Sequence, residues 1–168
     1  MKYSDDLYSK FSGDLFLALG THQKFDETLG IFYSSQILLA LEYLHYMGII
    51  YRDVKPENIL IIHDGYIKLT DYGFSKIIDH NRTYTFCGTP EYLAPEIVLL
   101  KGYDYTTDWW SFGVIIYEMI AGVTPFFDEN SEIIFNNIID CNYIIPKDFS
   151  SELKHLIQKM LVSDKSKR

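Results

Sequence analysis

The longest regular hydrophobic pattern in the sequence predicts a helix from about Asp26 to Met47. Apolar side chains at helical spacing form its buried face, and these are Tyr33, Ile37, Leu41 and Leu44. Asp26 is a residue type that caps helix N-termini, and Gly48 is one that ends helices. Gly30 interrupts the pattern and weakens the helix by roughly 1 kcal/mol relative to alanine. We interpret the apolar face as core rather than as a cofactor site.

Four further helices are expected. Residues 106–121 are apolar on every side, so this helix should be the buried centre of the domain. Residues 131–140 should form another helix, and a short one should open near Phe11 and end near Gly20. The last helix has Ser151 as its expected cap. Its apolar positions follow the spacing i, i+3, i+4, i+7 and i+8, and are Leu153, Leu156, Ile157, Met160 and Leu161.

Between the two longest helices the pattern changes to that of a β-hairpin. Two short apolar runs, residues 59–62 and 67–69, flank a turn at Asp64-Gly65. A hairpin brings its outer ends together, so Asn58 and Asp71 should lie side by side. The predicted fold class is therefore mainly α (α+β), a helical bundle with one small hairpin.

Composition narrows the class of protein and of partner. The chain has 168 residues, which suits one domain, and nearly half of them are hydrophobic, as in globular proteins. Its net charge is −8 and its pI about 5.0. An acidic protein lacks the basic footprint that nucleic-acid binding needs, so nucleic acid is excluded as a partner and a basic peptide is favoured.

Cysteine usage and the apolar segments bear on location. Two cysteines, Cys87 and Cys141, are too few for a disulfide scaffold, so we expect reduced thiols in an intracellular, cytoplasmic protein. The first residues have no apolar core and do not resemble a secretory signal. The longest apolar stretch, Trp109–Ile120, is too short to span a bilayer and contains Glu118, so no membrane segment is expected.

The candidate chemistry surrounds the hairpin. The loop Tyr51–Asn58 contains an acid, a cation and a carboxamide, namely Asp53, Lys55 and Asn58. With Asp71 beside Asn58, the pair of oxygen ligands suits a hard divalent cation that phosphate oxygens also hold. The alternative is a loop whose charges are merely solvated.

Three motifs carry a resemblance to a known family. Tyr51–Asn58 (YRDVKPEN) resembles the catalytic loop of eukaryotic protein kinases, and Asp71-Tyr72-Gly73 resembles their Asp-Phe-Gly metal motif. Residues 82–96 (RTYTFCGTPEYLAPE) resemble the activation segment of AGC-type serine/threonine kinases, the cyclic-nucleotide-dependent group in particular. Tyr72 departs from the usual Phe and adds a hydroxyl that needs a partner if it is buried.

The resemblance implies residue roles in phosphoryl transfer from ATP with Mg²⁺. Asp53 would accept or orient the proton of the attacking hydroxyl, and Lys55 would offset charge on the phosphoryl group and contact ATP. Asn58 and Asp71 would hold Mg²⁺ against the ATP phosphates. Asp14 would reach the ATP ribose and a substrate arginine. A helix N-terminal acid favoured by the macrodipole is the equally weighted alternative for Asp14.

Substrate contacts are implied in the same way. Lys55 in this context favours a serine/threonine kinase over a tyrosine kinase. Glu57 and Glu118 match acids that grip arginines before the phosphoacceptor, so protein substrates with basic residues near Ser or Thr are expected. An internal partner is the alternative for Glu118. Thr89 matches the residue that bonds the catalytic aspartate and lines the pocket after the phosphoacceptor.

Regulation is implied by the activation segment. Thr85 matches its phosphosite, which an upstream activating kinase would modify, and Arg52 and Lys76 match the cations that hold the phosphate.

Structural contacts are implied as well. Asp108 would anchor the backbone of the catalytic loop, while His45 would be structural. Glu96 and Arg168 match a structural ion pair, although a terminal residue is prone to fraying.

What the motifs omit shapes the expected domain organisation. No Gly-rich phosphate loop and no strand lysine in a Val-Ala-Ile-Lys-like context occur in the sequence. We therefore expect residues 1–168 to be a partial kinase domain, a hinge remnant and the C-terminal lobe, with the small N-terminal lobe and the last helix absent. Two functions follow: a serine/threonine protein kinase, or a catalytically impaired fragment that docks peptides or a kinase.

Overall fold

A computed structural model describes residues 13–78 and 82–168 of the chain. The polar N-terminal stretch and the expected helix start at Phe11 lie outside these residues. The helices are α2 (Leu15–His22), α3 (Glu27–Tyr46), α4 (Pro95–Val98), α5 (Thr106–Ala121), α6 (Ser131–Asp140) and α7 (Ser151–Met160). The strands are β1 (Gly13–Asp14), β2 (Ile49–Ile50), β3 (Ile59–Ile61), β4 (Ile67–Leu69) and β5 (Lys76–Ile77). Single 3₁₀ turns are η1 (Pro56–Asn58), η2 (Pro90–Tyr92) and η3 (Lys165–Lys167). The prediction of a mainly helical fold with a small hairpin is confirmed.

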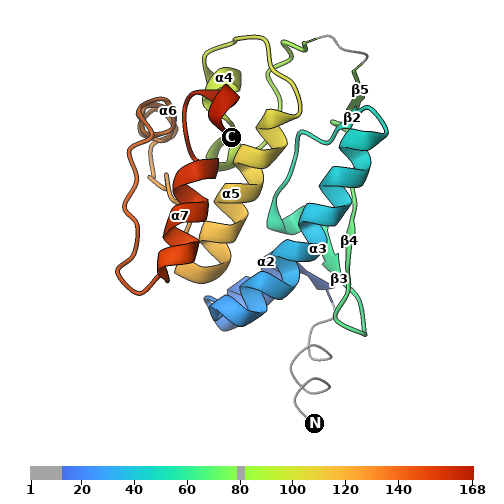
Figure 1. The fold of residues 1–168 in the computed structure, drawn as a ribbon, viewed down its shortest axis with the longest axis vertical. Coiled ribbons are helices and arrows are strands. Elements are labelled where there is room, and N and C mark those ends of the chain that lie inside the picture. The colour runs from blue at the N-terminus through green and yellow to red at the C-terminus, as the bar shows by residue number, and fades with distance from the viewer. Residues whose placement is uncertain (1–12, 79–81) are drawn as a thin grey trace.

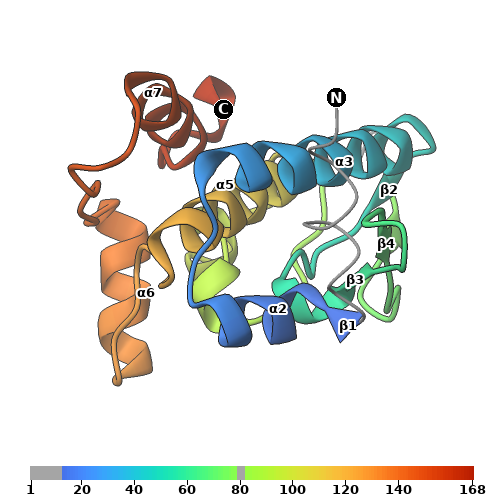
Figure 2. The same cartoon turned by 90° about the horizontal axis from the view of Figure 1, so that it is seen from below.

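The packing of α3 against α5 forms the centre of the molecule (Figures 1 and 2). The face predicted for α3 is buried, with Tyr33, Ile37 and Leu41 fully inaccessible to solvent. Gly30 lies in this contact, because a Cβ there would come within 3.0 Å of Ile120 Cδ1. The glycine that weakens α3 in isolation therefore lets the two helices approach closely.

Helix α5 is buried on nearly all sides, as its sequence predicts, and ends at Gly122 in the left-handed conformation (φ 83°). Trp110 stacks on Phe126 with ring centroids 5.4 Å apart. Helix α7 packs closely on α5 at Gly113, where a Cβ would lie only 2.9 Å from Met160 Cβ. The helix thus serves as the platform on which the other segments are mounted. No helix of residues 13–78 and 82–168 has both the length and the apolar character of a membrane span.

The predicted hairpin is formed by β3 and β4 in antiparallel register, with Ile59 opposite Leu69 and Ile61 opposite Ile67. β1 adds to the β3 edge, and β2 pairs with β5 in a second small sheet. At the open end of the hairpin the amide of Thr70 donates to the carbonyl of Asn58 at 2.9 Å. Asp71 follows Thr70 directly, so the hairpin brings Asn58 and Asp71 to the same end.

Three details differ from the sequence analysis. Ser150, not Ser151, caps α7, because its hydroxyl accepts the amide of Leu153 at 3.1 Å. Leu156 is 44% exposed and so lies outside the buried face to which its spacing assigned it. Helix α2 continues past Gly20 to His22.

Candidate functional site

The catalytic-loop carboxylate is enclosed by donors. Asp53 is 4% exposed, and its Oδ2 accepts from Asn58 Nδ2 at 2.8 Å and lies 3.1 Å from Lys55 Nζ. Its Oδ1 accepts from the Thr89 hydroxyl at a longer 3.3 Å. Lys55 Nζ also donates to the Thr89 hydroxyl oxygen at 3.1 Å. The structure thus brings together four residues that the sequence analysis singled out, and leaves Oδ1 the less occupied of the two oxygens.

Helix α5 fixes the backbone of this loop through Asp108. Its fully buried carboxylate accepts the amides of Tyr51 at 2.9 Å and Arg52 at 2.8 Å. His45 Nε2 lies 2.7 Å from the same carboxylate. Arg52 has a φ of 72°, a conformation that a non-glycine residue adopts only when its surroundings impose it. The Asp108 bonds supply that constraint, and His45 gives the buried acid a further partner.

The predicted metal ligands can be tested against the donors around them. Both hydrogens of the Asn58 amide are used, toward the carbonyl oxygen (2.9 Å) and Oδ2 (2.8 Å) of Asp53. No described residue donates to Asn58 Oδ1. Asp71 Oδ1 accepts the amide of Gly73 at 3.0 Å, and no described residue donates to its Oδ2. One oxygen of the buried Asn58 amide and one of the exposed Asp71 carboxylate therefore have no described donor at the open end of the hairpin, a set that fits a hard cation completed by phosphate oxygens.

This site differs from a metal cage built by protein alone. Among residues 13–78 and 82–168 no group of three or more His, Cys, Asp or Glu side chains could hold a metal ion. A cation at Asn58 and Asp71 would therefore take its remaining oxygen ligands from water or from a bound molecule.

Tyr72, the departure from the usual Phe, does not bury its hydroxyl group. The residue is 51% exposed, and its ring meets that of Tyr51 edge-on at 5.5 Å. The hydroxyl of Tyr51 donates instead to the carbonyl of Thr70 at the end of the hairpin. Burial and the nearby acidic groups raise the pKa of the Tyr51 hydroxyl, so this hydroxyl stays protonated and donates the bond. The substitution is thus accommodated without an unsatisfied buried hydroxyl group.

Three glutamate side chains lie around Tyr92, beside the loop of residues 51–58. The Tyr92 hydroxyl donates to Glu118 Oε2 at 2.7 Å, so Glu118 does have the internal partner that the sequence analysis kept as an alternative. Burial raises the pKa of Glu118 to about 7. The hydrogen bond from Tyr92 opposes this shift, whereas the negative charges of Glu91 and Glu57 add to it. A cavity of about 770 Å³ between α2 and the end of α5 is lined by Glu118. Lys24 lines the same cavity.

Glu91 was not singled out from the sequence, although it lies within the activation-segment motif. Its carboxylate accepts the hydroxyl of Thr124, which follows α5. The motif does not indicate that Glu91 lies near Glu118, because these two residues are far apart in the chain.

Asp14 caps helix α2. Its Oδ1 accepts the amide of Leu17 at 2.7 Å, which is the helix-terminal role kept as the alternative. Because β1 places Asp14 opposite Leu60 in the sheet, the residue also lies next to the hairpin. The capping bond uses one oxygen, and no described residue donates to the other.

The activation segment is attached through its neighbours rather than through Thr85 itself. Lys76 Nζ donates to the Thr83 hydroxyl oxygen at 3.1 Å, and Arg52 Nη1 donates to the Tyr103 hydroxyl at 3.3 Å. That hydroxyl donates to the Thr85 carbonyl at 2.7 Å. The Thr85 side chain is exposed, with both predicted cations held close to its segment. Tyr103, which the sequence analysis missed, is the central contact.

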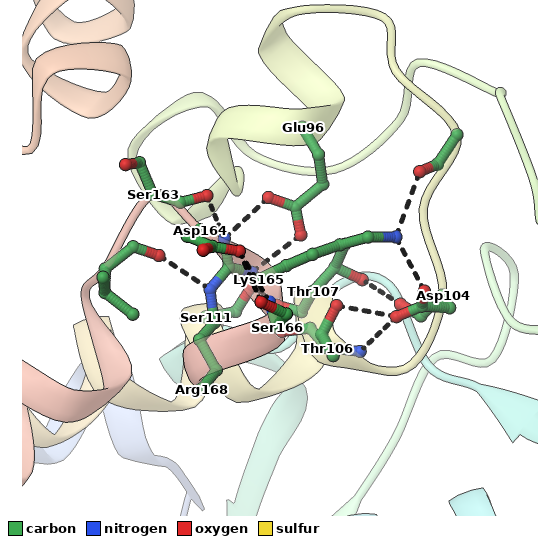
Figure 3. Close-up of polar contacts among 12 residues, drawn as sticks. Glu96, Asp104, Thr106, Thr107, Ser111, Ser163, Asp164, Lys165, Ser166 and Arg168 are labelled. Atoms are coloured by element: carbon green, nitrogen blue, oxygen red, sulfur yellow. Dashed lines mark hydrogen bonds and ion pairs between the residues drawn. The ribbon is translucent and has the colours of Figure 1, made fainter.

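The predicted ion pair between Glu96 and Arg168 is bidentate and buried. Arg168 Nη1 and Nη2 each donate to one carboxylate oxygen at 2.7 Å (Figure 3). The Arg168 side chain is fully inaccessible to solvent, and its Nε donates to the Val162 carbonyl at 3.0 Å. Its guanidinium also lies 5.0 Å from the ring centroid of Trp110. Contacts with α4, with α5 and with the segment that follows α7 thus hold Arg168 in place.

Comparison with known proteins agrees with the geometry. The protein kinase domain family model matches residues 8–168. The chain is 48% identical over 157 residues to the human cAMP-dependent protein kinase catalytic subunit PRKX, covering 93% of this chain and 43% of that protein. It is 49% identical over 158 residues to the Drosophila melanogaster cAMP-dependent protein kinase catalytic subunit 2, covering 93% and 44%.

A fungal relative gives the same result. The chain is 47% identical over 156 residues to the Saccharomyces cerevisiae cAMP-dependent protein kinase type 3, covering 93% of this chain and 39% of that protein. The chain thus spans less than half the length of these relatives. It belongs to the protein kinase domain family, which the motifs at residues 51–58, 71–73 and 82–96 predicted.

Proposed function

We propose that this chain carries the phosphoryl-transfer site of a serine/threonine protein kinase, which moves the γ-phosphate of ATP to a Ser or Thr hydroxyl. The observation that supports it most is the arrangement of Lys55, Asn58 and Thr89 around the buried carboxylate of Asp53. Charges that are merely solvated would have no reason to converge on one buried acid. We infer that the chain corresponds to the large lobe of the kinase domain.

In this proposal Asp53 receives the proton of the attacking hydroxyl. Its Oδ2 already has two donors within 3.1 Å, whereas Oδ1 has one at 3.3 Å, so Oδ1 is the oxygen with room for the substrate. Lys55, whose Nζ lies 3.1 Å from Oδ2, stabilises negative charge that develops on the transferred group. Thr89 holds the lysine and the aspartate in one geometry.

Mg²⁺ and ATP are the proposed partners of the two oxygens to which no described residue donates. Asn58 Oδ1 and the Asp71 carboxylate would hold the metal, which when bound neutralises phosphate charge and orients the nucleotide. Their separation along the chain is bridged by the Thr70 to Asn58 hydrogen bond of 2.9 Å. Asp14, with one oxygen in the helix cap, would offer the other to the ribose or to a basic substrate side chain.

The substrate class follows from charge. Glu57, Glu91 and Glu118 gather around Tyr92, and the chain as a whole has a net charge of −8. These acids would bind basic residues near the phosphoacceptor Ser or Thr, while Thr89 would line the pocket beyond it. A buried carboxyl such as Glu118 has most to gain from a cationic partner.

We further propose that an upstream kinase phosphorylates Thr85 and that Arg52 and Lys76 hold the phosphate. Both cations already contact the neighbours of Thr85 in the structure. Cys87 and Cys141 are free thiols, which fits the intracellular, cytoplasmic location proposed for the protein.

Binding of Mg²⁺ and ATP tests the proposal. Calorimetric titration, on the chain alone and with a kinase small lobe added, should show ATP binding that requires Mg²⁺. Asp71→Ala should weaken it by about 10²-fold, whereas Asp64→Ala, at the far hairpin turn, should leave it unchanged. If ATP binds the parent no more tightly than the Asp71→Ala variant, the alternative of a catalytically impaired docking module replaces the kinase.

A further inference from the structure

The segment Gly102–Asp104 lies between the C-terminal segment and the activation segment. Lys165, the first residue of η3, holds it at both ends, because its Nζ donates to the Gly102 carbonyl at 3.2 Å and to Asp104 Oδ2 at 2.7 Å (Figure 3). The side chains of Lys165 and Asp104 are only 23% and 32% exposed. This ion pair is therefore partly shielded from water, unlike a pair between two surface side chains.

The residue between these two anchor points is Tyr103, which is 1% exposed. Its amide and carbonyl exchange two hydrogen bonds of 3.0 Å with Thr83. Its hydroxyl donates to the Thr85 carbonyl at 2.7 Å, accepts from Arg52 Nη1 at 3.3 Å, and lies 3.8 Å from Cys87 Sγ. One side chain thus joins the activation segment to the catalytic loop.

Gly102 provides a second connection between Lys165 and the activation segment. A Cβ at Gly102 would lie 2.9 Å from Arg82 Cδ and 2.9 Å from Tyr84 Cζ, so these two activation-segment side chains rest directly on its backbone. The carbonyl of the same residue accepts the hydrogen bond from Lys165 Nζ. A displacement of Gly102 would consequently move the surface on which Arg82 and Tyr84 pack.

Asp104 divides its two oxygens between two tasks. Oδ1 accepts the amide of Thr106 at 3.1 Å and its hydroxyl at 2.7 Å, which secures the start of α5, while Oδ2 accepts Lys165. Burial favours the neutral acid, but the bonds from Lys165 and Thr106 outweigh it and lower the pKa of Asp104. Substitution of Lys165 thus removes the bonds to the Gly102 carbonyl and to Asp104 Oδ2, and leaves the bonds from Thr106 to Asp104 at the start of α5 intact.

We propose that Lys165 is a positioning residue, which by holding Gly102–Asp104 keeps Tyr103 in place and thereby fixes the activation segment and Arg52. The inference rests on the proposed function, because the activation segment that Lys165 positions contains the proposed phosphosite, Thr85. The interaction itself is structural and can be measured without phosphoryl transfer. Three segments far apart in the sequence, the catalytic loop, the activation segment and η3, are joined through this contact.

The thiol of Cys87 reports on the contact, because it is buried against Tyr103. The 168-residue chain with Cys141→Ser has this thiol alone, and its reaction with an excess of a maleimide gives a rate of local opening. Lys165→Met should increase the rate about fivefold, the factor expected for one partly shielded ion pair. Lys165→Arg should restore the parental rate, since it keeps the charge.

Lys167→Met is the matched control, two residues away in an ion pair with Asp164 whose side chains are 70% and 49% exposed. It should leave the Cys87 rate unchanged. Amide exchange at Ile115, inside α5, monitors global unfolding and should be the same in Lys165→Met and the parent.

Several results would overturn the inference. They are equal Cys87 rates in Lys165→Met and Lys167→Met, a faster rate that Lys165→Arg does not reverse, or a parallel loss of protection at Ile115. Phosphorylation of a basic peptide is measured on the same proteins, with Mg²⁺ and a kinase small lobe supplied. A chain that transfers no phosphate but shows the predicted Cys87 rates would refute the proposed function and retain the role of Lys165.

Discussion

Asp108 Oδ1 accepts the backbone amide of Arg52 at 2.8 Å, and Arg52 is held there at a φ of 72°. Helix α5 therefore imposes the conformation of the loop that carries the proposed proton acceptor, Asp53. Since Asp53 is the next residue, the direction of its carboxylate depends on this bond. The catalytic loop is thus shaped from α5, the most deeply buried helix of the domain.

Removal of the Asp108 carboxylate should destabilise the fold. Asp108→Ala leaves the amides of Tyr51 and Arg52 without acceptors in a buried site and deprives His45 of its partner. We expect a loss of roughly 3 kcal/mol in the free energy of unfolding, measured by urea denaturation. Asp148→Ala, which breaks the exposed pair with Lys24, should cost less than about 1 kcal/mol. Equal losses would contradict the anchoring role.

Close helix packing predicts opposite effects for two glycines. Gly113→Ala should destabilise the protein by about 1–3 kcal/mol, because its new Cβ would meet Met160 Cβ at 2.9 Å. Gly20→Ala, in α2 with nothing within 4 Å of the new Cβ, should stabilise it by roughly 0.5–1 kcal/mol. Thermal unfolding distinguishes the two, and a stabilising Gly113→Ala would show that α7 is not packed on α5 as described.

The affinity for basic peptides should depend on pH through Glu118. Burial raises its pKa from an ordinary 4.5 to about 7, so the carboxyl is protonated below that pH and attracts cations only above it. Affinity for an arginine-containing peptide should rise about three- to tenfold as pH increases through this range. Fluorescence anisotropy measures it, and Glu118→Gln should abolish the change. A pH-independent parent would exclude this role for Glu118.

The same shift has the opposite sign for stability. Because the folded state binds the Glu118 proton more tightly than the unfolded chain, the contribution of this group to stability decreases as pH rises from 4.5 to about 7. Without a peptide, Glu118→Gln should weaken this pH dependence of the free energy of unfolding. Stronger peptide binding and lower intrinsic stability should therefore develop over one pH range.

Phosphorylation of Thr85 should order the segment 82–91. A phosphate adds about −1.5 to −2 charges to the segment that Lys76 contacts at Thr83 and Arg52 contacts through Tyr103. Limited proteolysis should cut this segment more slowly after phosphorylation. Thr85→Ala treated with the same kinase is the control. Unchanged cleavage of the phosphorylated chain would contradict the prediction.

The sequence was most informative where a pattern is local. The α3 face with Tyr33 and Ile37 followed from spacing alone, and the hairpin from Asp64-Gly65 between two apolar runs. The cap of α7 was misplaced by one residue because Ser150 and Ser151 are equally good cap types. Leu156 has the right spacing but lies at the edge of the buried face, which only tertiary packing determines.

Contacts between distant segments could not be predicted in this way. The two-residue strands β2 and β5 have no period of their own and exist because the chain brings them together. The contacts of Lys165 with Asp104, and of Tyr103 with Thr83, join residues that carry no mutual pattern in the sequence. The grouping of Lys55, Asn58 and Thr89 around Asp53 involves residues of recognisable motifs, which is why the sequence analysis named all four.

Phosphoryl transfer from labelled ATP to an arginine-containing serine peptide tests the central claim most directly. The experiment compares the parent, Asp53→Asn and Asp64→Asn, each with Mg²⁺ and a small lobe supplied. We predict that Asp53→Asn lowers kcat by about 10²–10³-fold with little change in the peptide KM, since the loss concerns the transition state. Asp64→Asn, at the far hairpin turn, should match the parent. Equal kcat values for Asp53→Asn and the parent would contradict the assignment of this carboxylate as the proton acceptor.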